Sequence, residues 1–310
     1  MKYALINGVP LDGTETMQPR PGLSILVNGD RIEAIVPAGT EGSDYERIDL
    51  AGGYVMPGLI NLHVHLPASG KPTVKQKDNK KTVRLMTSNA LLRAVTFRVC
   101  AGYAKTELLS GVTTLRSVGG IQAVDSCLRD KILSGKAVGP RILAGNMAVS
   151  VPGGHMAGSL AYAMFDRSVT GASETEQYNG RIVMDGIIAC AKACLERGIP
   201  VGLGTDTGCP YITHYDMWRE VYYFHKLCNV SNAFALHTAT LGNARLVGLG
   251  AETGSIEPGK CADLIVTRAN PLEDLKALRH IDLVMGRGNL IRAPKVKKIE
   301  KAERELDKFL

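Results

Sequence analysis

Two histidines at the end of an apolar stretch are the side chains best placed to do metal chemistry. The run Leu59-Ile-Asn-Leu-His-Val-His65 has the pattern of a buried strand that ends in His63 and His65. Residues two apart in a strand point to the same face, so both imidazoles can reach one point, as two ligands of one metal ion must. The spacing equally suits two packed histidines, and a lone His-x-His motif does not decide between these interpretations.

A carboxylate much further along the chain follows another predicted strand. Asp206 stands directly after the strand 199–205, in the sequence Gly-Thr-Asp-Thr-Gly. Side chains at the carboxyl ends of neighbouring parallel strands meet at one edge of a sheet, so Asp206 could converge with His63 and His65. Beside a metal-activated water, a carboxylate can act as ligand and as general base. The alternative is that Asp206 only caps a helix.

The elements around these residues alternate between strands and helices. Leu85, Leu92, Val95 and Val99 recur at near-helical spacing, which predicts a helix after the histidines. The alternation of strand and helix that follows indicates a parallel α/β fold. The predicted strands are 2–7, 24–28, 31–36, 47–55, 59–64, 112–118, 141–147, 199–205, 281–285 and 289–292; the predicted helices are 82–110, 121–134, 183–197, 213–229 and 231–248. We expect the strands of both chain ends to join in one small β module.

Composition narrows the class of protein. The chain has 310 residues, of which 45% are hydrophobic and 22% charged, as expected for a globular protein with a core. Its net charge of +7 is not arranged in a stripe with aromatic side chains, which argues against nucleic-acid binding, a function that would show steep salt dependence. The seven cysteines form no Cys-x-x-Cys pair, and no segment suits a signal peptide or a membrane span, so we expect a cytoplasmic protein.

Five segments together resemble the amidohydrolase superfamily, in its imidazolonepropionase-like and Xaa-Pro or Xaa-Arg dipeptidase branch. They are 55–65, 111–116, 153–155, 204–208 and 254–265. The resemblance implies an α/β fold, a TIM-type (β/α) barrel over 56–251, with a β-sandwich formed by 1–55 and 252–293 and a charged C-terminal helix at 294–310. It also implies hydrolysis of a C–N bond of a small molecule, such as a dipeptide or an N-acyl amino acid, by metal-activated water. By this resemblance His63 and His65 match Zn²⁺ ligands of strand 1, and Asp206 matches the strand 8 aspartate that binds metal and moves the proton.

The chain also departs from the family pattern. No residue matches the lysine of strand 4 or the histidines of strands 5 and 6, and the barrel region is short by about three or four strand–helix units. We therefore expect an incomplete barrel, with an internal deletion of about 100 residues joined near 157–165. Such a barrel would expose strand edges through which copies could associate. The alternative function is a catalytically impaired scaffold with weak or no metal binding.

Three further residues are candidates for the substrate side of the site, and of these His155 resembles a substrate-side residue of the family. His155 lies in a glycine-rich loop, and Tyr211 and His214 follow Asp206. Tyr211 and His214 equally suit capping or packing. For His214, His225, His237 and His280 we expect structural roles rather than direct metal ligation.

Overall fold

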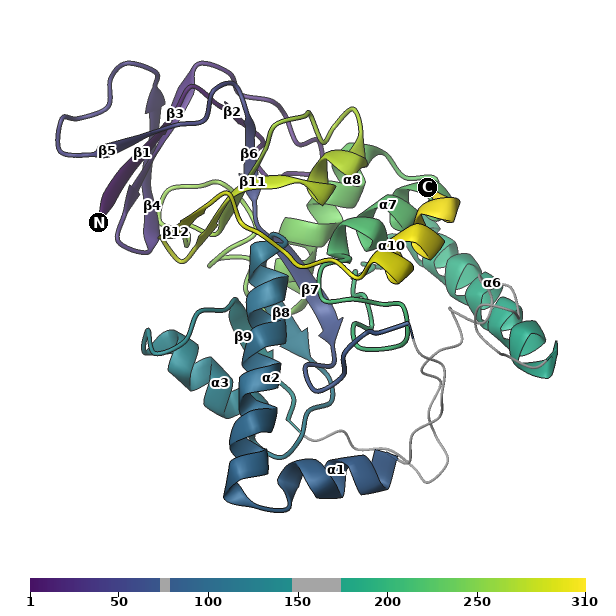
Figure 1. Cartoon of the computed structure of the whole chain (residues 1–310). Helices are drawn as coiled ribbons and strands as arrows, with labels where there is room; N and C mark the ends of the chain where they lie inside the picture. The colour runs from purple at the N-terminus through teal and green to yellow at the C-terminus, as the bar shows by residue number, and fades with distance from the viewer. Residues whose placement is uncertain (73–78, 147–173) are drawn as a thin grey trace.

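Two β-sheets form the upper part of the molecule in the computed structural model (Figure 1). The structure describes residues 1–72, 79–146 and 174–310. The first sheet has the order β4-β3-β1-β5 and the second the order β12-β11-β10-β6-β2. Their strands are β1 (Lys2–Ile6), β2 (Val9–Pro10), β3 (Leu23–Asn28), β4 (Arg31–Pro37), β5 (Glu46–Asp49), β6 (Tyr54–Pro57), β10 (Leu264–Thr267), β11 (Ile281–Gly286) and β12 (Asn289–Arg292).

Strands from both chain ends share the second sheet. β10 runs antiparallel to β6, with Val266 opposite Val55. Side chains of the two sheets pack in one hydrophobic core, in which Leu5 and Ile25 of the first sheet meet Leu264 and Met285 of the second. The two chain ends therefore fold together, while the domain boundaries at 55 and 252 stay a prediction.

A parallel sheet below these two carries the histidines. It has the order β7-β8-β9, with β7 (Leu59–Val64), β8 (Val112–Ser117) and β9 (Arg141–Ala144). α2 (Ala90–Leu109) connects β7 to β8, and α3 (Val124–Leu133) connects β8 to β9 (Figure 1). The predicted strand–helix alternation thus gives the parallel arrangement that chirality and connection length favour.

The helix predicted over 82–110 is two helices. α1 (Asn79–Thr87) ends before Asn89, and α2 begins after it. The Asn89 side chain accepts a hydrogen bond from the Leu92 backbone N–H at 2.9 Å, so it caps a new helix instead of continuing the old one. The sequence predicts one continuous helix because the helical spacing of apolar residues continues on both sides of Asn89.

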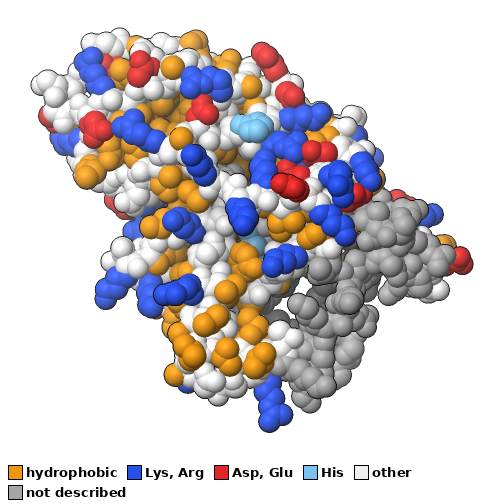
Figure 2. Space-filling view, viewed as in Figure 1, with side chains coloured by type: hydrophobic (Ala, Val, Ile, Leu, Met, Phe, Trp, Pro, Cys, Tyr) orange, Lys and Arg blue, Asp and Glu red, His pale blue; other side chains and the backbone are white. Residues whose placement is uncertain are grey.

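The apolar stripe that predicts this helix does not face the core. Leu85, Val95 and Val99 are exposed, and Figure 2 shows hydrophobic side chains gathered over the lower end of α2. The buried face of α2 instead carries small and polar side chains, among them Cys100 and Glu107. Because small side chains allow close approach, α2 packs tightly on β8 and places a carboxyl group inside the protein.

An extended segment, 203–207, lies alongside β7 on the edge opposite to β8. The Leu62 N–H donates to the Leu203 carbonyl at 3.1 Å, and the His65 N–H donates to the Thr207 carbonyl at 2.9 Å. At other positions a side-chain amide replaces a backbone partner from a neighbouring strand. Asn243 Oδ1, for example, accepts a hydrogen bond from the Leu203 N–H at 2.9 Å. The predicted strand 199–205 is therefore an extended segment rather than a regular strand, and an isolated bridge to β7, Val64 to Thr207, comes just after it.

Helices of the second half of the chain complete the fold. They are α6 (Glu174–Glu196), α7 (Met217–Cys228), α8 (Asn232–His237), the π-helical turn η1 (Thr238–Gly242), α9 (Asn243–Leu246), the 3₁₀ helix η2 (Leu275–Arg279), α10 (Glu300–Leu306) and the 3₁₀ turn η3 (Asp307–Phe309). Among the described residues, no helix combines the length and apolar character needed to cross a bilayer.

The C-terminal helix is shorter and better anchored than expected. α10 starts only at Glu300, not near residue 294. The buried guanidinium of Arg219 contacts Asp216 at 3.1 Å, Glu303 at 3.2 Å and Asp307 at 2.7 Å. Because an unpaired buried charge would be costly, these ion pairs hold the C-terminal helix against α7.

Replacing Gly204 tests how closely segment 203–207 packs on β7. A methyl group on Gly204 would lie 2.7 Å from the His63 Cβ and backbone N, a distance that forces the two segments apart. We expect Gly204→Ala to lower the free energy of unfolding by about 1–3 kcal/mol, measured by urea denaturation. Gly102→Ala is the control, because a methyl group there meets no atom within 4 Å; it should stabilise α2 by about 0.5–1 kcal/mol. Equal effects of both substitutions would contradict the close packing.

Glu220 of α7 makes the stability depend on pH. Burial raises the pKa of its carboxyl to about 7, against a hydrogen bond from the Gly204 N–H that lowers it. The folded state therefore holds a proton that the unfolded chain releases near pH 4.5, and stability falls as the pH rises through 7. We expect Glu220→Gln to be more stable than the parent at pH 8 by on the order of 1–3 kcal/mol, and to show a flatter dependence between pH 5 and 8. Glu196→Gln on the exposed end of α6 should keep the parental slope. Identical slopes for the parent and Glu220→Gln would refute this role of Glu220.

Candidate metal centre

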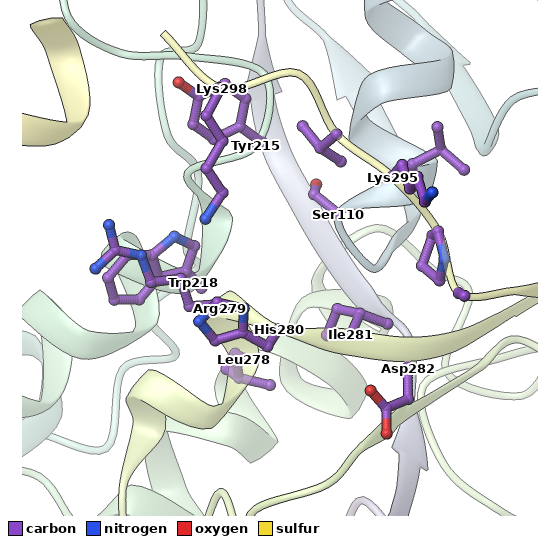
Figure 3. A pocket seen from close by; sticks show the side chains of 14 residues that line it. Ser110, Tyr215, Trp218, Leu278, Arg279, His280, Ile281, Asp282, Lys295 and Lys298 are labelled. Atoms are coloured by element: carbon purple, nitrogen blue, oxygen red, sulfur yellow. The ribbon is translucent and has the colours of Figure 1, made fainter. Parts of the chain in front are cut away.

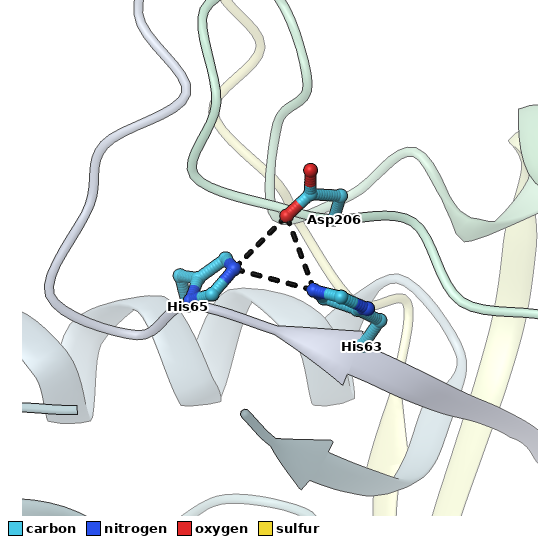
Figure 4. A group of neighbouring side chains, drawn as sticks. All are labelled: His63, His65 and Asp206. Carbon is cyan, nitrogen blue, oxygen red and sulfur yellow. Dashed lines mark hydrogen bonds and ion pairs between the residues drawn. The ribbon is translucent and has the colours of Figure 1, made fainter. Parts of the chain in front are cut away.

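Three side chains converge at the carboxyl end of β7. Asp206 Oδ1 lies 2.9 Å from His65 Nε2 and 3.3 Å from His63 Nε2, and the two Nε2 atoms are 3.3 Å apart (Figure 4). Among the described residues, this is the one group of three or more His, Cys, Asp or Glu side chains whose ligand atoms meet. All three side chains are partly exposed, so a small molecule can reach them from solvent.

Backbone geometry aims the three groups at one another. His63 and His65 are two residues apart on an extended backbone and therefore project from the same face. Asp206 has φ +56°, in the left-handed region, which turns its carboxylate out of the line of segment 203–207 and toward the rings. Aspartate tolerates this conformation better than most residues. Gly208 follows with φ +114°, where a methyl group would lie 2.9 Å from the His65 carbonyl oxygen, so only glycine fits.

Neighbouring groups fix the orientation of His65 and Asp206. His65 Nδ1 donates to the Gly119 carbonyl at 3.4 Å, so its Nε2 is the atom that faces the cluster. Asp206 Oδ2 accepts from the Cys209 thiol at 3.4 Å, which leaves Oδ1 for the histidines. A backbone carbonyl behind a histidine is the arrangement that orients metal-binding imidazoles in proteins.

The charges of the cluster are strongly coupled. Burial alone would raise the pKa of Asp206, but hydrogen bonds from His63 and His65 outweigh it and hold this pKa well below its usual range. The hydrogen bond to Asp206 in turn raises the pKa of His65, against the opposing effect of burial. Asp206 is therefore an anion throughout the neutral pH range.

The donor set fits a divalent transition metal ion. Bonds of about 2.0–2.1 Å at tetrahedral angles place two ligand nitrogens about 3.3–3.4 Å apart. The observed Nε2 separation is 3.3 Å. Two imidazoles and one carboxylate also leave one coordination position open, as in zinc sites that do chemistry.

The other three predicted site residues are not part of this cluster. His214 is buried; its Nδ1 lies 3.2 Å from Glu107 Oε1, and its Nε2 donates to the Ala68 carbonyl at 2.8 Å. Tyr211 is buried and packs with Leu306 of α10. These contacts favour the packing roles that the sequence left open, and substrate contact by either residue stays a prediction. His155, like the expected join at 157–165, lies outside the described residues.

Sequence reasoning missed two buried polar residues beneath the centre. Asn61 is fully buried in β7, and Glu107 of α2 is 1% exposed. Asn61 is the one polar residue before His63 in an apolar strand, which is a signal that could have been used. Glu107 carries no such signal, because a glutamate in a helix is ordinarily solvated.

A cavity of about 710 Å³ lies elsewhere, between the end of α2, α7 and the segment before α10 (Figure 3). Its lining includes Trp218, Arg279, His280 and Lys298, and none of the three cluster residues. The cavity is therefore separate from the candidate metal centre.

Known proteins resemble this chain in both sequence and fold. A family model described as the amidohydrolase family matches residues 179–291. The imidazolonepropionase of Thermoplasma acidophilum is 22% identical over an alignment of 366 positions, which covers 86% of this chain and 88% of that protein. A Bifidobacterium longum protein assigned as a prolidase superposes with a TM-score of 0.85 at 24% identity, covering 99% of this chain and 98% of the other. A Xaa-Pro dipeptidase with bound methionine in its active site gives a TM-score of 0.76 at 21% identity, covering 94% and 100%.

The two structural likenesses establish the fold, which is the TIM-barrel type of the amidohydrolases. The family match and the imidazolonepropionase relative extend the likeness to the sequence. The resemblance seen in the sequence is thereby confirmed: the chain is similar to amidohydrolases in its sequence over residues 179–291, to an imidazolonepropionase over most of its length, and to dipeptidase structures in its fold.

Proposed function

We propose that this chain is a metal-dependent hydrolase that cleaves a C–N bond of a small molecule such as a dipeptide or an N-acyl amino acid. The observation that carries the proposal is the convergence of His63, His65 and Asp206 within 3.3 Å of one another. The name of the similar Xaa-Pro dipeptidase supports a dipeptide-like substrate.

His63, His65 and Asp206 would hold the ion, for which we propose Zn²⁺. When bound, a divalent ion of this kind polarises a carbonyl group and makes water a stronger nucleophile at neutral pH. The residues of the chain supply the rest. The hydrogen bond to the Gly119 carbonyl keeps Nε2 of His65 directed at the site, and the low pKa of Asp206 keeps its carboxylate charged.

Asp206 is the residue to which we assign proton transfer. The attacking water loses a proton as its oxygen bonds to the carbonyl carbon, and the leaving nitrogen must gain one as the C–N bond breaks. A carboxylate beside both atoms can accept the first proton and deliver it to the nitrogen. Asp206 Oδ2, which the histidines leave unused, is placed for this role because its partner, the Cys209 thiol, is only a weak donor.

We further propose that the barrel is incomplete. The alignment with the imidazolonepropionase spans 366 positions, whereas 86% of this chain is about 267 residues, so about 100 positions of the alignment have no counterpart here. In the described part of the chain, the parallel sheet has three regular strands and ends at β9. Loss of the intervening strand–helix units would remove other potential ligands and leave a site for a single ion. Association of copies through the exposed strand edges stays a prediction.

A competing proposal follows from the same observation. A centre with three ligands on an incomplete barrel could bind metal and lack turnover, which would make the chain a catalytically impaired scaffold. Metal content and turnover, measured on the same preparation, separate the two.

The test removes bound metal with a chelator, restores Zn²⁺ or Co²⁺, and follows hydrolysis of Xaa-Pro dipeptides and N-acyl amino acids. We expect turnover to be lost on chelation and regained with about one ion per chain. Asp206→Asn should lower kcat by about 10²–10⁴-fold, since it removes the proton carrier. Asp130→Asn, at an exposed pair with Arg129 in α3, is the matched control and should leave kcat unchanged.

Each outcome has one meaning. Turnover that survives chelation or Asp206→Asn would contradict the proposed mechanism. One bound ion per chain without turnover on either substrate class would favour the impaired scaffold.

A further inference from the structure

A buried carboxyl group lies at the base of the candidate metal centre without touching its ligands. Glu107 of α2 is 1% exposed. Its Oε2 accepts a hydrogen bond from Asn61 Nδ2 at 3.4 Å, its Oε1 lies 3.2 Å from His214 Nδ1, and it also hydrogen-bonds Thr207. Burial raises the pKa of this carboxyl, and the three hydrogen bonds oppose that rise. One side chain thus contacts β7, segment 203–207 and the loop that follows it.

Asn61 links Glu107 to residues next to the metal ligands. Its Nδ2 also donates to Thr205 Oγ1 at 2.9 Å, and its Oδ1 accepts from the backbone N–H of Thr205 at 3.1 Å. The same Oδ1 lies 3.3 Å from the His63 N–H. Asn61 therefore joins the residue preceding Asp206 to the backbone of His63, across two segments more than 140 positions apart in the sequence.

His214 links Glu107 to the loop that follows His65. Its Nε2 donates to the Ala68 carbonyl at 2.8 Å, and its ring stacks on Tyr103 of α2 at 4.4 Å. Ala68 belongs to the loop directly after His65, and its N–H donates to the His65 carbonyl at 3.1 Å. Glu107 is thereby linked, through Asn61 and His214, to the backbone on both sides of the two histidines.

This link matters because few backbone hydrogen bonds join β7, which leads into the two histidines, to segment 203–207, which carries Asp206. Segment 203–207 does not form a regular ladder with β7, and its backbone bonds to β7 are those at Leu62 and His65. A metal site keeps its affinity only when its ligands are held within about 0.5 Å of the productive geometry. An apolar residue at 107 could fill the same space, but it would remove one hydrogen-bond acceptor from Asn61 and one partner from Thr207 in the interior.

We infer that Glu107 is a positioning residue of the metal centre, which holds Asp206 at its distance from His63 and His65 through Asn61, Thr207 and His214. The inference rests on the proposed metal-dependent function and deepens it. Glu107 contributes no ligand atom; it fixes the register between the two segments that do.

Co²⁺ binding to the full-length, chelator-treated protein tests this role, because the visible absorption of Co²⁺ reports ligand geometry. We expect Glu107→Leu to raise the apparent Kd for Co²⁺ by about 10- to 100-fold and to change the absorption bands. Glu107→Gln keeps an acceptor for Asn61 and should restore most of the affinity. Thr207→Val, which keeps the side-chain shape and removes the hydroxyl, should weaken binding to an intermediate extent.

Glu303→Leu is the matched control. Glu303 is also a buried glutamate, but its ion-pair partners are Arg219 and Arg279 beside the C-terminal helix, rather than Asn61, Thr207 or His214. This variant should lose stability and keep the parental Co²⁺ affinity and spectrum, measured at temperatures where each variant is fully folded.

The outcomes separate this inference from the proposed function. A parent protein that binds Co²⁺, with Glu107→Leu showing the same Kd and spectrum, would overturn the positioning role and leave the function standing. Equal weakening by Glu303→Leu would also overturn it, since the effect would then follow stability alone. A parent protein that binds no Co²⁺ would overturn both. If Glu107→Leu fails to fold, the same comparison is made with Thr207→Val, and parental binding by that variant overturns the positioning role.

Discussion

The separation between β7 and segment 203–207 is the constraint on which the rest of this structure depends. It decides whether Asp206 reaches the imidazoles of His63 and His65, which sit on the other segment. Two glycines permit the approach, since side chains at Gly204 and Gly208 would collide with His63 and with the His65 carbonyl. Buried amides and hydroxyls, rather than a full hydrogen-bond ladder, hold the two segments in register.

This use of side chains explains why the interior beneath the centre is polar. Asn61, Thr207 and Glu107 are buried among the apolar side chains of β7, β8 and α2. Burial of such groups stabilises a fold only when each finds a partner. Here the partners are one another, so the network is costly to disturb and specific in geometry, which are the properties that a metal centre requires of its support.

Much of the fold could be predicted from the spacing of apolar residues along the sequence and from the residues that end each strand or helix. The apolar strand before His63, the β-branched strand over 112–118 and the strands over 281–285 and 289–292 are local signals, and each corresponds to an element of the structure. The convergence of Asp206 with the histidines could be predicted too, because residues at the carboxyl ends of parallel strands share an edge.

Other features depend on packing that no local pattern encodes. The break at Asn89 comes from a side-chain cap inside an apolar pattern. The inward face of α2 carries Cys100, Ala104 and Glu107, whereas its apolar residues Val95 and Val99 point to solvent, so the usual link between hydrophobicity and burial fails there. The late start and firm anchoring of α10 depend on Arg219, whose three partners lie up to 88 residues away. In each case a long-range contact decides what the local sequence leaves open.

The central claim is that one metal ion binds between His63, His65 and Asp206. The most direct measurement is a crystal structure of the protein grown with Zn²⁺, with diffraction data collected at the zinc absorption edge. The account predicts one strong anomalous difference peak per chain, about 2.0–2.1 Å from both Nε2 atoms and from an oxygen of Asp206. An anomalous map with no peak among these three side chains, or with zinc bound only elsewhere, would contradict it.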